Sequence, residues 1–151
     1  GKPLLDRVVY LDNAGGPATE VTIGSQKHSV KPGEVKKLEL VGGTCEGALG
    51  VKRNGKAVAE LPGKPTLRQN QAAPAVIDVT GKHCYALRKV IYVTSGNDAK
   101  HLKREAPRPL EEARIVEAPD VRYVLEPVPD TVKTPMAGAL THTALEHRSC
   151  R

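Results

Sequence analysis

Short runs in which apolar and polar residues alternate are the clearest pattern along the chain. Three of them follow one another, at Val21–Gln26, His28–Glu34 and Lys37–Leu40, with glycine or Pro-Gly at the turns. Alternation with a period of two, rich in β-branched residues, is typical of strands that bury one face. The pattern predicts a small antiparallel sheet with one face in water. Sheets of this kind usually carry binding rather than catalysis.

Further strand-like runs surround this region. Arg7–Leu11 ends in a turn-rich stretch at residues 12–17, and the runs Gly47–Lys52 and Ala57–Leu61 flank the dipeptide Asn54-Gly55. Asn-Gly between two strands favours a type I′ turn, because both central residues of that turn need a positive φ. We therefore predict a hairpin centred on Asn54-Gly55.

The second half of the chain continues in the same way after a polar, proline-bounded connection at residues 62–74. Its expected strands are Ala75–Val79, Cys84–Leu87, Lys89–Val93 and Val121–Glu126. Leu110–Arg114, which follows a proline and has acids in its first turn, could instead begin a short helix. A strand through Arg114–Glu117 competes with that helix, and we favour the strand.

These elements indicate an all-β fold. About eight to ten short strands separated by turns, without alternating helices, predict a single antiparallel β-sandwich of the immunoglobulin-like kind, with little or no helix. The length of 151 residues suits one domain. We expect the sandwich to span residues 1–136. Residues 137–151 lack a strong pattern and are expected to form a loosely packed C-terminal tail.

The composition limits the kind of core that the fold can build. The chain has no Phe, no Trp and one Met, and its four Tyr are the only large rings. The core must therefore consist of Val, Leu, Ile and Ala. A buried tyrosine needs a partner for its hydroxyl, so we expect the tyrosines at the margins of the core.

The basic character of the chain points to an acidic partner. The net charge is +6, and the stretch 82–114 holds eight of the Lys and Arg residues. We expect a basic patch there that binds another protein, and an acidic partner would suit its charge. Nucleic acid is disfavoured, because basic residues mix with acids throughout and no motif combines aromatic stacking with basic residues. The residues assigned to the patch are Lys82, Arg88, Lys89, Lys100, Lys103, Arg104 and Arg108.

Nothing in the chain predicts a membrane span, because no run approaches the roughly 20 apolar residues that one needs. The first residues contain neither an initiator Met nor a signal-type pattern, so we expect a processed or engineered start. For the compartment, we slightly favour the periplasm or the extracellular space over the cytoplasm.

The three cysteines, Cys45, Cys84 and Cys150, contain no C-x-x-C pair, so neither a zinc ribbon nor a thioredoxin-type site is expected. Cys45 and Cys84 lie in different strand regions, and two ordinary buried thiols are the favoured interpretation. In an exported protein we expect these two to form a disulfide, with Cys150 free. In the cytosol all three would be reduced.

Candidate catalytic and metal-binding residues are sparse. His142, Glu146, His147 and Cys150 could hold a metal ion if this segment were helical, but Thr141 and Thr143 are poor helix formers. His83 and Cys84 are neighbours on a predicted strand and therefore point to opposite faces, which excludes a Cys–His nucleophile pair. No Gly-x-Ser-x-Gly motif or phosphate-binding loop occurs. We expect no catalytic residues, no metal and no cofactor.

Two segments resemble small uncharacterised bacterial β-sandwich modules that are associated with the cell envelope. Tyr10–Asn13, Val21–Gly24, Val30–Glu34 and Leu38–Leu40 match the strand and hairpin pattern of such modules. Arg122–Pro129 is similar to a closing strand in some of them. The resemblance implies a sandwich fold and brings no catalytic residues.

These features favour a non-enzymatic protein-binding module of an envelope, secretion, immunity or adaptor type, which docks through exposed strand edges and the basic patch. One alternative is a structural or self-assembling subunit, in which Pro127–Arg151 wraps around a neighbouring copy. The other is a metal-dependent or hydrolytic enzyme that uses the His/Cys tail.

Overall fold

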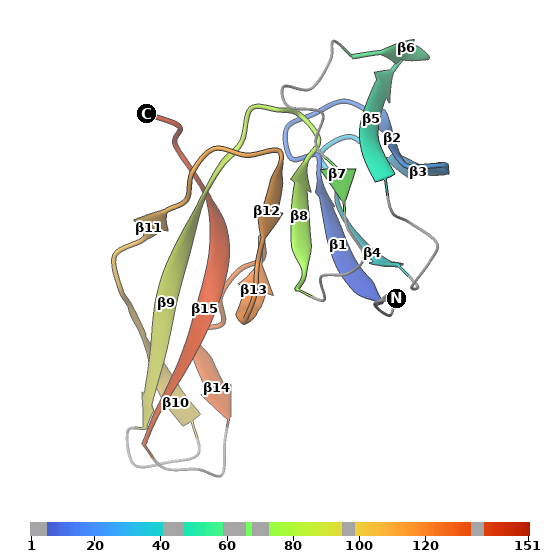
Figure 1. Ribbon diagram of the computed structural model, residues 1–151. Helices are drawn as coiled ribbons and strands as arrows, with labels where there is room; N and C mark the ends of the chain where they lie inside the picture. The colour runs from blue at the N-terminus through green and yellow to red at the C-terminus, as the bar shows by residue number, and fades with distance from the viewer. Residues whose placement is uncertain (1–5, 41–46, 59–65, 68–72, 95–98, 134–137) are drawn as a thin grey trace. The chain divides into compact units, whose positions relative to one another are not determined.

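The computed structural model describes residues 6–40, 47–58, 66–67, 73–94, 99–133 and 138–151, and every regular element in these ranges is a β-strand (Figure 1). The predicted all-β class is therefore confirmed. The strands form three sheets. They are divided between two compact units, rather than between a domain 1–136 and a tail. Unit 1 comprises residues 1–82 and 113–119, and unit 2 comprises residues 83–112 and 120–151.

The first sheet of unit 1 has the order β12-β8-β1-β4. Its strands are β1 (Arg7–Asp12), β4 (Val35–Leu40), β8 (Ala75–Asp78) and β12 (Ile115–Glu117). β1 runs antiparallel to β4 and parallel to β8. The strand favoured over a helix near residues 114–117 is confirmed as β12, although it pairs with β8 in unit 1 and not with its sequence neighbours.

The second sheet of unit 1 has the order β3-β2-β5-β6, and β7 pairs with β5. Its strands are β2 (Thr19–Ile23), β3 (Gln26–Val30), β5 (Gly47–Arg53), β6 (Lys56–Ala57) and β7 (Thr66–Leu67). Asn54 and Gly55 join β5 to β6 with φ values of 52° and 75°, which confirms the predicted hairpin.

The three consecutive strands that opened the sequence pattern do not form one sheet. β2 and β3 pair with each other, but β4 belongs to the other sheet, beside β1. The turn between β3 and β4 is closed by the Glu34 N–H, which donates to the Lys31 carbonyl over 3.1 Å. Alternation fixes which face of a strand is buried, but it does not choose the strand's partner.

The hydrophobic cluster of unit 1 draws on both of its sheets, and its described members are aliphatic, as the composition predicts. Its buried members are Val9, Leu11, Val21, Ile23, Val30, Leu40, Val51, Ala75, Ile77 and Val79. β-Branched residues dominate this set because they pack well on a pleated surface.

Unit 2 is one sheet with the order β13-β15-β9-β10-β14, to which β11 adds by pairing with β9. Its strands are β9 (Cys84–Thr94), β10 (Ala99–Arg104), β11 (Arg108–Pro109), β13 (Val121–Val124), β14 (Thr131–Lys133) and β15 (Ala139–Arg148). The long strands β9 and β15 run side by side along the middle of the sheet (Figure 1).

Strand β15 corrects the expectation of a loosely packed tail. Residues 139–148 pair with β9 along their whole length and with β13 on the other side. The alternation of Leu140, His142 and Ala144 with Thr141 and Thr143 is the strand signal in this segment. Its Thr and His residues hid that signal, although Ala144 and Leu145, which point to opposite faces of the strand, are both buried.

The tyrosines of unit 2 lie inside its core and not only at the margin. Tyr92 is fully buried beside Val90, Tyr123 and Ala144. Its hydroxyl donates a 2.6 Å hydrogen bond to the Pro129 carbonyl, so the buried Tyr92 hydroxyl has a partner. The expectation of marginal tyrosines is therefore wrong for Tyr92.

Candidate functional site

Strand β3 is an edge of its sheet, and among the described strands its one neighbour is β2. Gly24, with a φ of 58°, and Ser25 form the two-residue turn between them, so Ile23 and Gln26 are opposite each other. A glycine with positive φ at the first central position is typical of a type II′ turn, which places a hydrogen-bonded pair next to the turn. Backbone groups of Gln26 and His28 therefore face β2, and those of Lys27 and Ser29 point outward.

One of these outward groups is already occupied. Lys36 Nζ donates a 2.7 Å hydrogen bond to the Ser29 carbonyl. Within the described residues, no hydrogen bond reaches the Ser29 N–H or the backbone of Lys27 from the outer side. Both residues are exposed. The edge thus offers two donors and one acceptor to an incoming strand.

A hollow of about 300 Å³ lies against this edge. Its residues come from the start of β2, the end of β3 and the β5–β6 hairpin: Ala18, Thr19, Glu20, Ser29, Val30, Lys52, Asn54 and Gly55. Glu20 is the register partner of both Ser29 and Lys52, so opposite charges line one wall. The hollow can accept a side chain that combines an apolar stem with a polar end.

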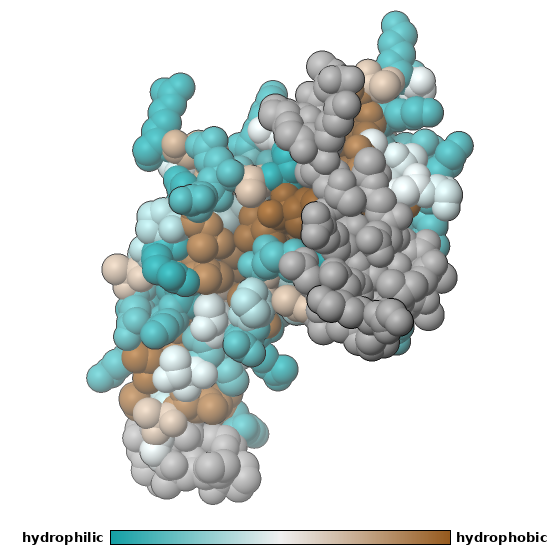
Figure 2. All heavy atoms as spheres, viewed as in Figure 1, coloured by the Kyte–Doolittle hydropathy of each residue, from teal (hydrophilic) through white to brown (hydrophobic). Residues whose placement is uncertain are grey.

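The predicted basic patch does not form one surface. Arg88 and Arg104 pair with acids, Arg88 with Glu146 at 2.9 Å and Arg104 with Asp130 at 3.7 Å. Neighbouring residues on a strand point to opposite faces, so exposed Lys89 and Lys103 lie on the other face of the sheet. On the side of unit 2 seen in Figure 2, hydrophilic and apolar residues alternate.

The remaining residues of the expected patch are also spread out. Arg108 is exposed on the short strand β11, and Lys82 belongs to unit 1. Lys100 belongs to β10, but its side chain lies outside the described part of the structure. Sequence proximity overstated this cluster, since strands separate neighbouring side chains onto two faces.

The structure pairs Cys84 with Cys150, not with Cys45. Antiparallel pairing of β9 with β15 places Cys84 opposite Arg148, and the chain then brings Cys150 to a Cα–Cα distance of 5.2 Å. That distance is within the range that a disulfide needs. Cys45 lies outside the described residues. The expected Cys45–Cys84 bond and the free Cys150 are therefore both corrected.

Arg148 ties the chain segments around this disulfide together. Its Nε donates to the Tyr85 carbonyl over 3.0 Å, and its Nη2 donates to the Leu110 carbonyl over 2.9 Å. The Leu110 N–H donates to the same Tyr85 carbonyl. Leu110 is thereby fixed beside the ends of β9 and β15, and Glu112 follows two residues later. Sequence reasoning missed Glu112 because no spacing rule connects it to a cysteine 28 residues away.

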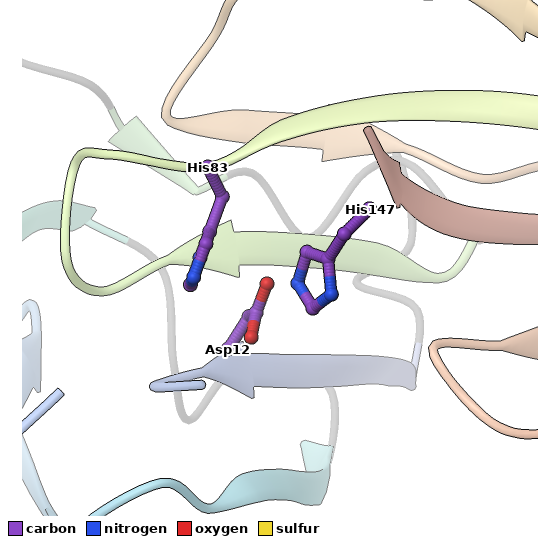
Figure 3. Close-up of side chains that lie close together, drawn as sticks. All are labelled: Asp12, His83 and His147. Atoms are coloured by element: carbon purple, nitrogen blue, oxygen red, sulfur yellow. The ribbon is translucent and has the colours of Figure 1, made fainter. Parts of the chain in front are cut away.

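The imidazole rings of His83 and His147 lie next to each other (Figure 3), with their centroids 4.6 Å apart. Tyr85 stacks on the same group, 5.6 Å from His147. Tyr85 and Cys84 point to opposite faces of β9, so the histidines do not share a face with the sulfur of Cys84. Asp12, also drawn in Figure 3, belongs to unit 1 and accepts a hydrogen bond from the Ala14 N–H.

The metal-binding set considered for the tail is not brought together. His142 and Glu146 share one face of β15 but are about 13 Å apart, at roughly 3.3 Å per residue. His147 points to the other face, and Cys150 is in the disulfide. Rings of Tyr92 and Tyr123 contact His142 instead. Burial, and then Arg122, lower the pKa of His142 below its ordinary value.

The structure does not show the free C-terminal segment on which the self-assembling alternative was based. The segment expected to wrap around a neighbouring copy contains β15, which pairs with two strands of its own chain. Its terminal cysteine is bonded within the chain as well.

No protein-family model matches this chain, and neither the curated proteins nor the solved structures include one that is similar to it. None of the described segments is a helix long and apolar enough to cross a membrane.

Proposed function

We propose that this protein is a non-enzymatic protein-binding module that takes up an extended segment of a partner along strand β3. The observation that carries the proposal is the outward-facing backbone of Lys27 and Ser29 on an edge strand. A partner strand gains affinity from main-chain hydrogen bonds to such an edge and specificity from pockets beside it.

The hollow beside β3 supplies the specificity in this proposal. Alternate residues of an added strand point to the same face of the sheet, so one of them can enter the hollow next to Ser29. Lys27 is exposed on the edge, and Lys36 reaches it from β4. These two cations favour a partner segment that carries acidic residues.

Selection of peptides from a displayed library against the full chain tests this function. Each selected peptide is measured by fluorescence anisotropy against wild type, Ser29→Pro and Ser29→Ala. Proline removes the outward N–H and crowds the edge, so binding should weaken at least about tenfold, whereas alanine keeps the N–H and should bind as wild type does.

The control for folding is His28→Pro, whose lost N–H faces β2. It should destabilise unit 1 by about 2 kcal/mol more than Ser29→Pro, because it removes a bond of the β2–β3 ladder. Peptides that bind Ser29→Pro as tightly as wild type would show that the edge is not the binding site. Failure to select any peptide would also count against the proposal.

We also propose that the module works in an oxidising compartment, the periplasm or the extracellular space, as expected for an envelope-associated bacterial sandwich. Support comes from the Cys84–Cys150 bond, because disulfides persist where the surroundings are oxidising. For the sandwich, the support is unit 1, in which two sheets share one core. Thiol titration of unfolded, non-reduced protein from its native host should find one reactive thiol per chain. Three thiols would contradict this compartment.

A further inference from the structure

Two sulfurs and a carboxylate come together at the disulfide end of unit 2. Sγ of Cys84, Sγ of Cys150 and a carboxylate oxygen of Glu112 lie within 4.8 Å of one another. Cys84 is buried, and the other two residues are exposed. Three potential ligands of this kind, open to solvent on one side, match the donor set of a zinc site that keeps one position for water.

The spacing of the two cysteines also suits a metal ion. Two Zn–S bonds of about 2.3 Å at a tetrahedral angle hold the sulfurs about 3.8 Å apart. Cα atoms 5.2 Å apart allow that separation by side-chain rotation, without movement of β9 or β15. Arg148 holds the strand ends and Leu110 in place through backbone carbonyls, so the frame around the sulfurs does not depend on the S–S bond alone.

We propose that Cys84, Cys150 and Glu112 form a redox-gated zinc site, which stays a disulfide in the oxidising compartment proposed above and binds one Zn²⁺ only after a dithiol has reduced it. Thiolates select zinc over the harder divalent ions, and Glu112 adds an oxygen ligand. This ligand set differs from the His142, Glu146, His147 and Cys150 set considered from the sequence.

A dithiol can reduce the disulfide and so convert the site to its zinc-binding form. The dithiol passes two electrons and two protons to the Cys84–Cys150 bond; that S–S bond breaks, and the dithiol closes into its own disulfide. Zn²⁺ then displaces one proton from each of the two thiols and binds both thiolates and the Glu112 carboxylate. The two protons are released to solvent, so zinc affinity should rise with pH.

Cobalt titration of the full chain tests the site. The protein carries Cys45→Ser, which leaves only the two cysteines of the site, and it is reduced with a water-soluble phosphine under argon. One Co²⁺ per chain should bind, with a thiolate-to-cobalt charge-transfer band and the intense visible bands of tetrahedral cobalt, and Zn²⁺ should displace it. The oxidised protein should show neither band.

Two matched variants separate the proposed ligand from its neighbours. Glu112→Gln should weaken zinc binding at least about tenfold, whereas Glu111→Gln, one residue away, should leave it unchanged. Cys84→Ser and Cys150→Ser should each abolish the charge-transfer band or reduce it to that of one thiolate. Absence of the band in reduced protein, or equal zinc affinities in the two glutamate variants, would overturn the proposal.

Circular dichroism decides the case in which reduction unfolds unit 2. Zinc should then restore the strand signal of reduced protein but not that of the Cys84→Ser/Cys150→Ser double variant. A reduced protein that zinc does not refold would overturn the proposal as clearly as a missing cobalt band. The result is independent of peptide binding at β3, which the Ser29 variants measure.

Discussion

Unit 1 and unit 2 are both built of strands, but different interactions hold them together. Unit 1 has strands of two to seven residues around an aliphatic core, and two of its strand pairs, β2–β3 and β5–β6, are joined by two-residue turns. Unit 2 depends on two strands of 11 and 10 residues that come from distant parts of the chain. Tyrosines fill its core, and a disulfide with a sequence separation of 66 residues joins its ends.

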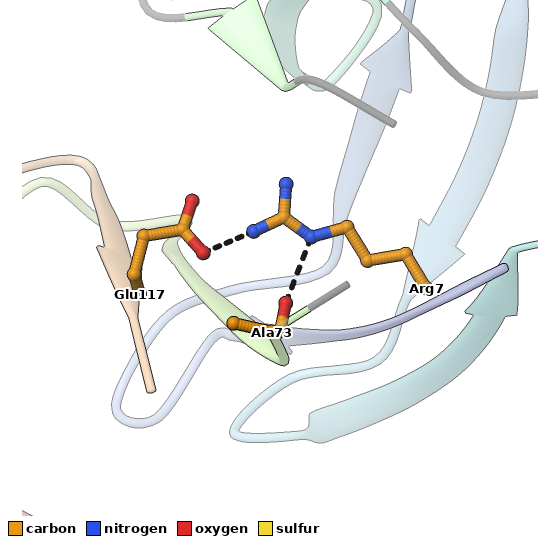
Figure 4. A network of polar contacts seen from close by, with 3 residues as sticks. All are labelled: Arg7, Ala73 and Glu117. Atoms are coloured by element: carbon orange, nitrogen blue, oxygen red, sulfur yellow. Dashed lines mark hydrogen bonds and ion pairs between the residues drawn. The ribbon is translucent and has the colours of Figure 1, made fainter. Parts of the chain in front are cut away.

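A buried ion pair is among the polar contacts that stabilise unit 1 in addition to its apolar core. The side chain of Arg7 is fully buried and forms an ion pair with Glu117 of β12 (Figure 4). Its Nε also donates a 2.9 Å hydrogen bond to the Ala73 carbonyl. This network fixes β12, the piece of unit 1 that comes from beyond residue 112, to the start of β1.

Unit 2 has a buried polar contact inside its tyrosine core. Burial first, and then the neighbouring Tyr123, raise the pKa of Tyr92 to about 12. The Tyr92 hydroxyl therefore remains a donor to Pro129 over the whole physiological pH range. Local turns specify the pairs β2–β3 and β5–β6, whereas the pairing of distant strands, as in β1–β8 and β9–β15, needs further fixed points against the entropy of closing a long loop.

The largest expected effect on stability comes from removing the Cys84–Cys150 disulfide of unit 2. The Cys84→Ser/Cys150→Ser variant should lose about 4 kcal/mol of stability, because a loop of this length is no longer closed in the unfolded chain. Hydrogen exchange read residue by residue should show lost protection in β9 and β15, with β1 and β2 nearly unchanged. Equal losses of protection in both units would contradict the view that the disulfide stabilises unit 2 in particular. Cys45→Ser, which leaves the bond intact, is the control.

The next effect tests the ionic anchor of unit 1. Glu117→Ala should cost about 2–3 kcal/mol, because the buried guanidinium of Arg7 loses its partner. Glu117→Gln keeps a hydrogen-bond acceptor and should cost less. Chemical denaturation combined with hydrogen exchange should locate the loss in β8 and β12. Unchanged protection in these strands would mean that the pair contributes little to unit 1.

A smaller effect compares one tyrosine in each unit. Tyr92→Phe removes the hydrogen bond to Pro129 and should destabilise unit 2 by about 1 kcal/mol. Tyr10→Phe is the matched change in unit 1, where Tyr10 lies on β1 and is half-buried. It should be close to neutral in thermal denaturation. A larger loss for Tyr10→Phe would contradict the assignment of tyrosine stabilisation to unit 2.

The smallest expected effect is a dependence of stability on pH, which comes from His28 in unit 1 and His142 in unit 2. Burial lowers the pKa of both imidazoles below 6.5. A neighbouring cation lowers the pKa further, Lys36 for His28 and Arg122 for His142. The unfolded chain therefore binds these protons first as the pH falls. The contribution to stability is complete above pH 6.5 and is lost as the pH falls from 6.5 through the lower pKa of the folded state.

NMR titration of the two imidazoles checks this and separates the units. Both midpoints should lie below 6.5. Arg122→Gln should raise the pKa of His142 alone, and Lys36→Gln should raise that of His28 alone. A midpoint at or above 6.5 for either residue, or a shift of both by one substitution, would contradict the local origin of the effect.

Much of the local structure follows from the chain itself. The Asn54-Gly55 hairpin, most strands of unit 1 and its aliphatic core could be predicted, because turn residues and alternation act over a few neighbours. Strand β7 was missed, since it lies in the stretch expected to be a connection. The β3 edge and the group of Glu112 with the two cysteines were harder to predict from the sequence. The edge position of β3 depends on β4 pairing in the other sheet. Glu112 approaches the cysteines because β11 pairs with β9 and because Tyr85 and Arg148 both bond to Leu110.

The sequence by itself determined the all-β class, the positions of the tight turns and the lack of any large apolar ring except tyrosine. Only the tertiary structure decided that β15 lies in the middle of a sheet, that Cys84 bonds with Cys150, and that the basic residues divide between two faces. The physical reason is range. Turn conformation and burial pattern are properties of adjacent residues, whereas strand partners are chosen by the burial and pairing of distant segments, such as those that place Cys84 opposite Arg148.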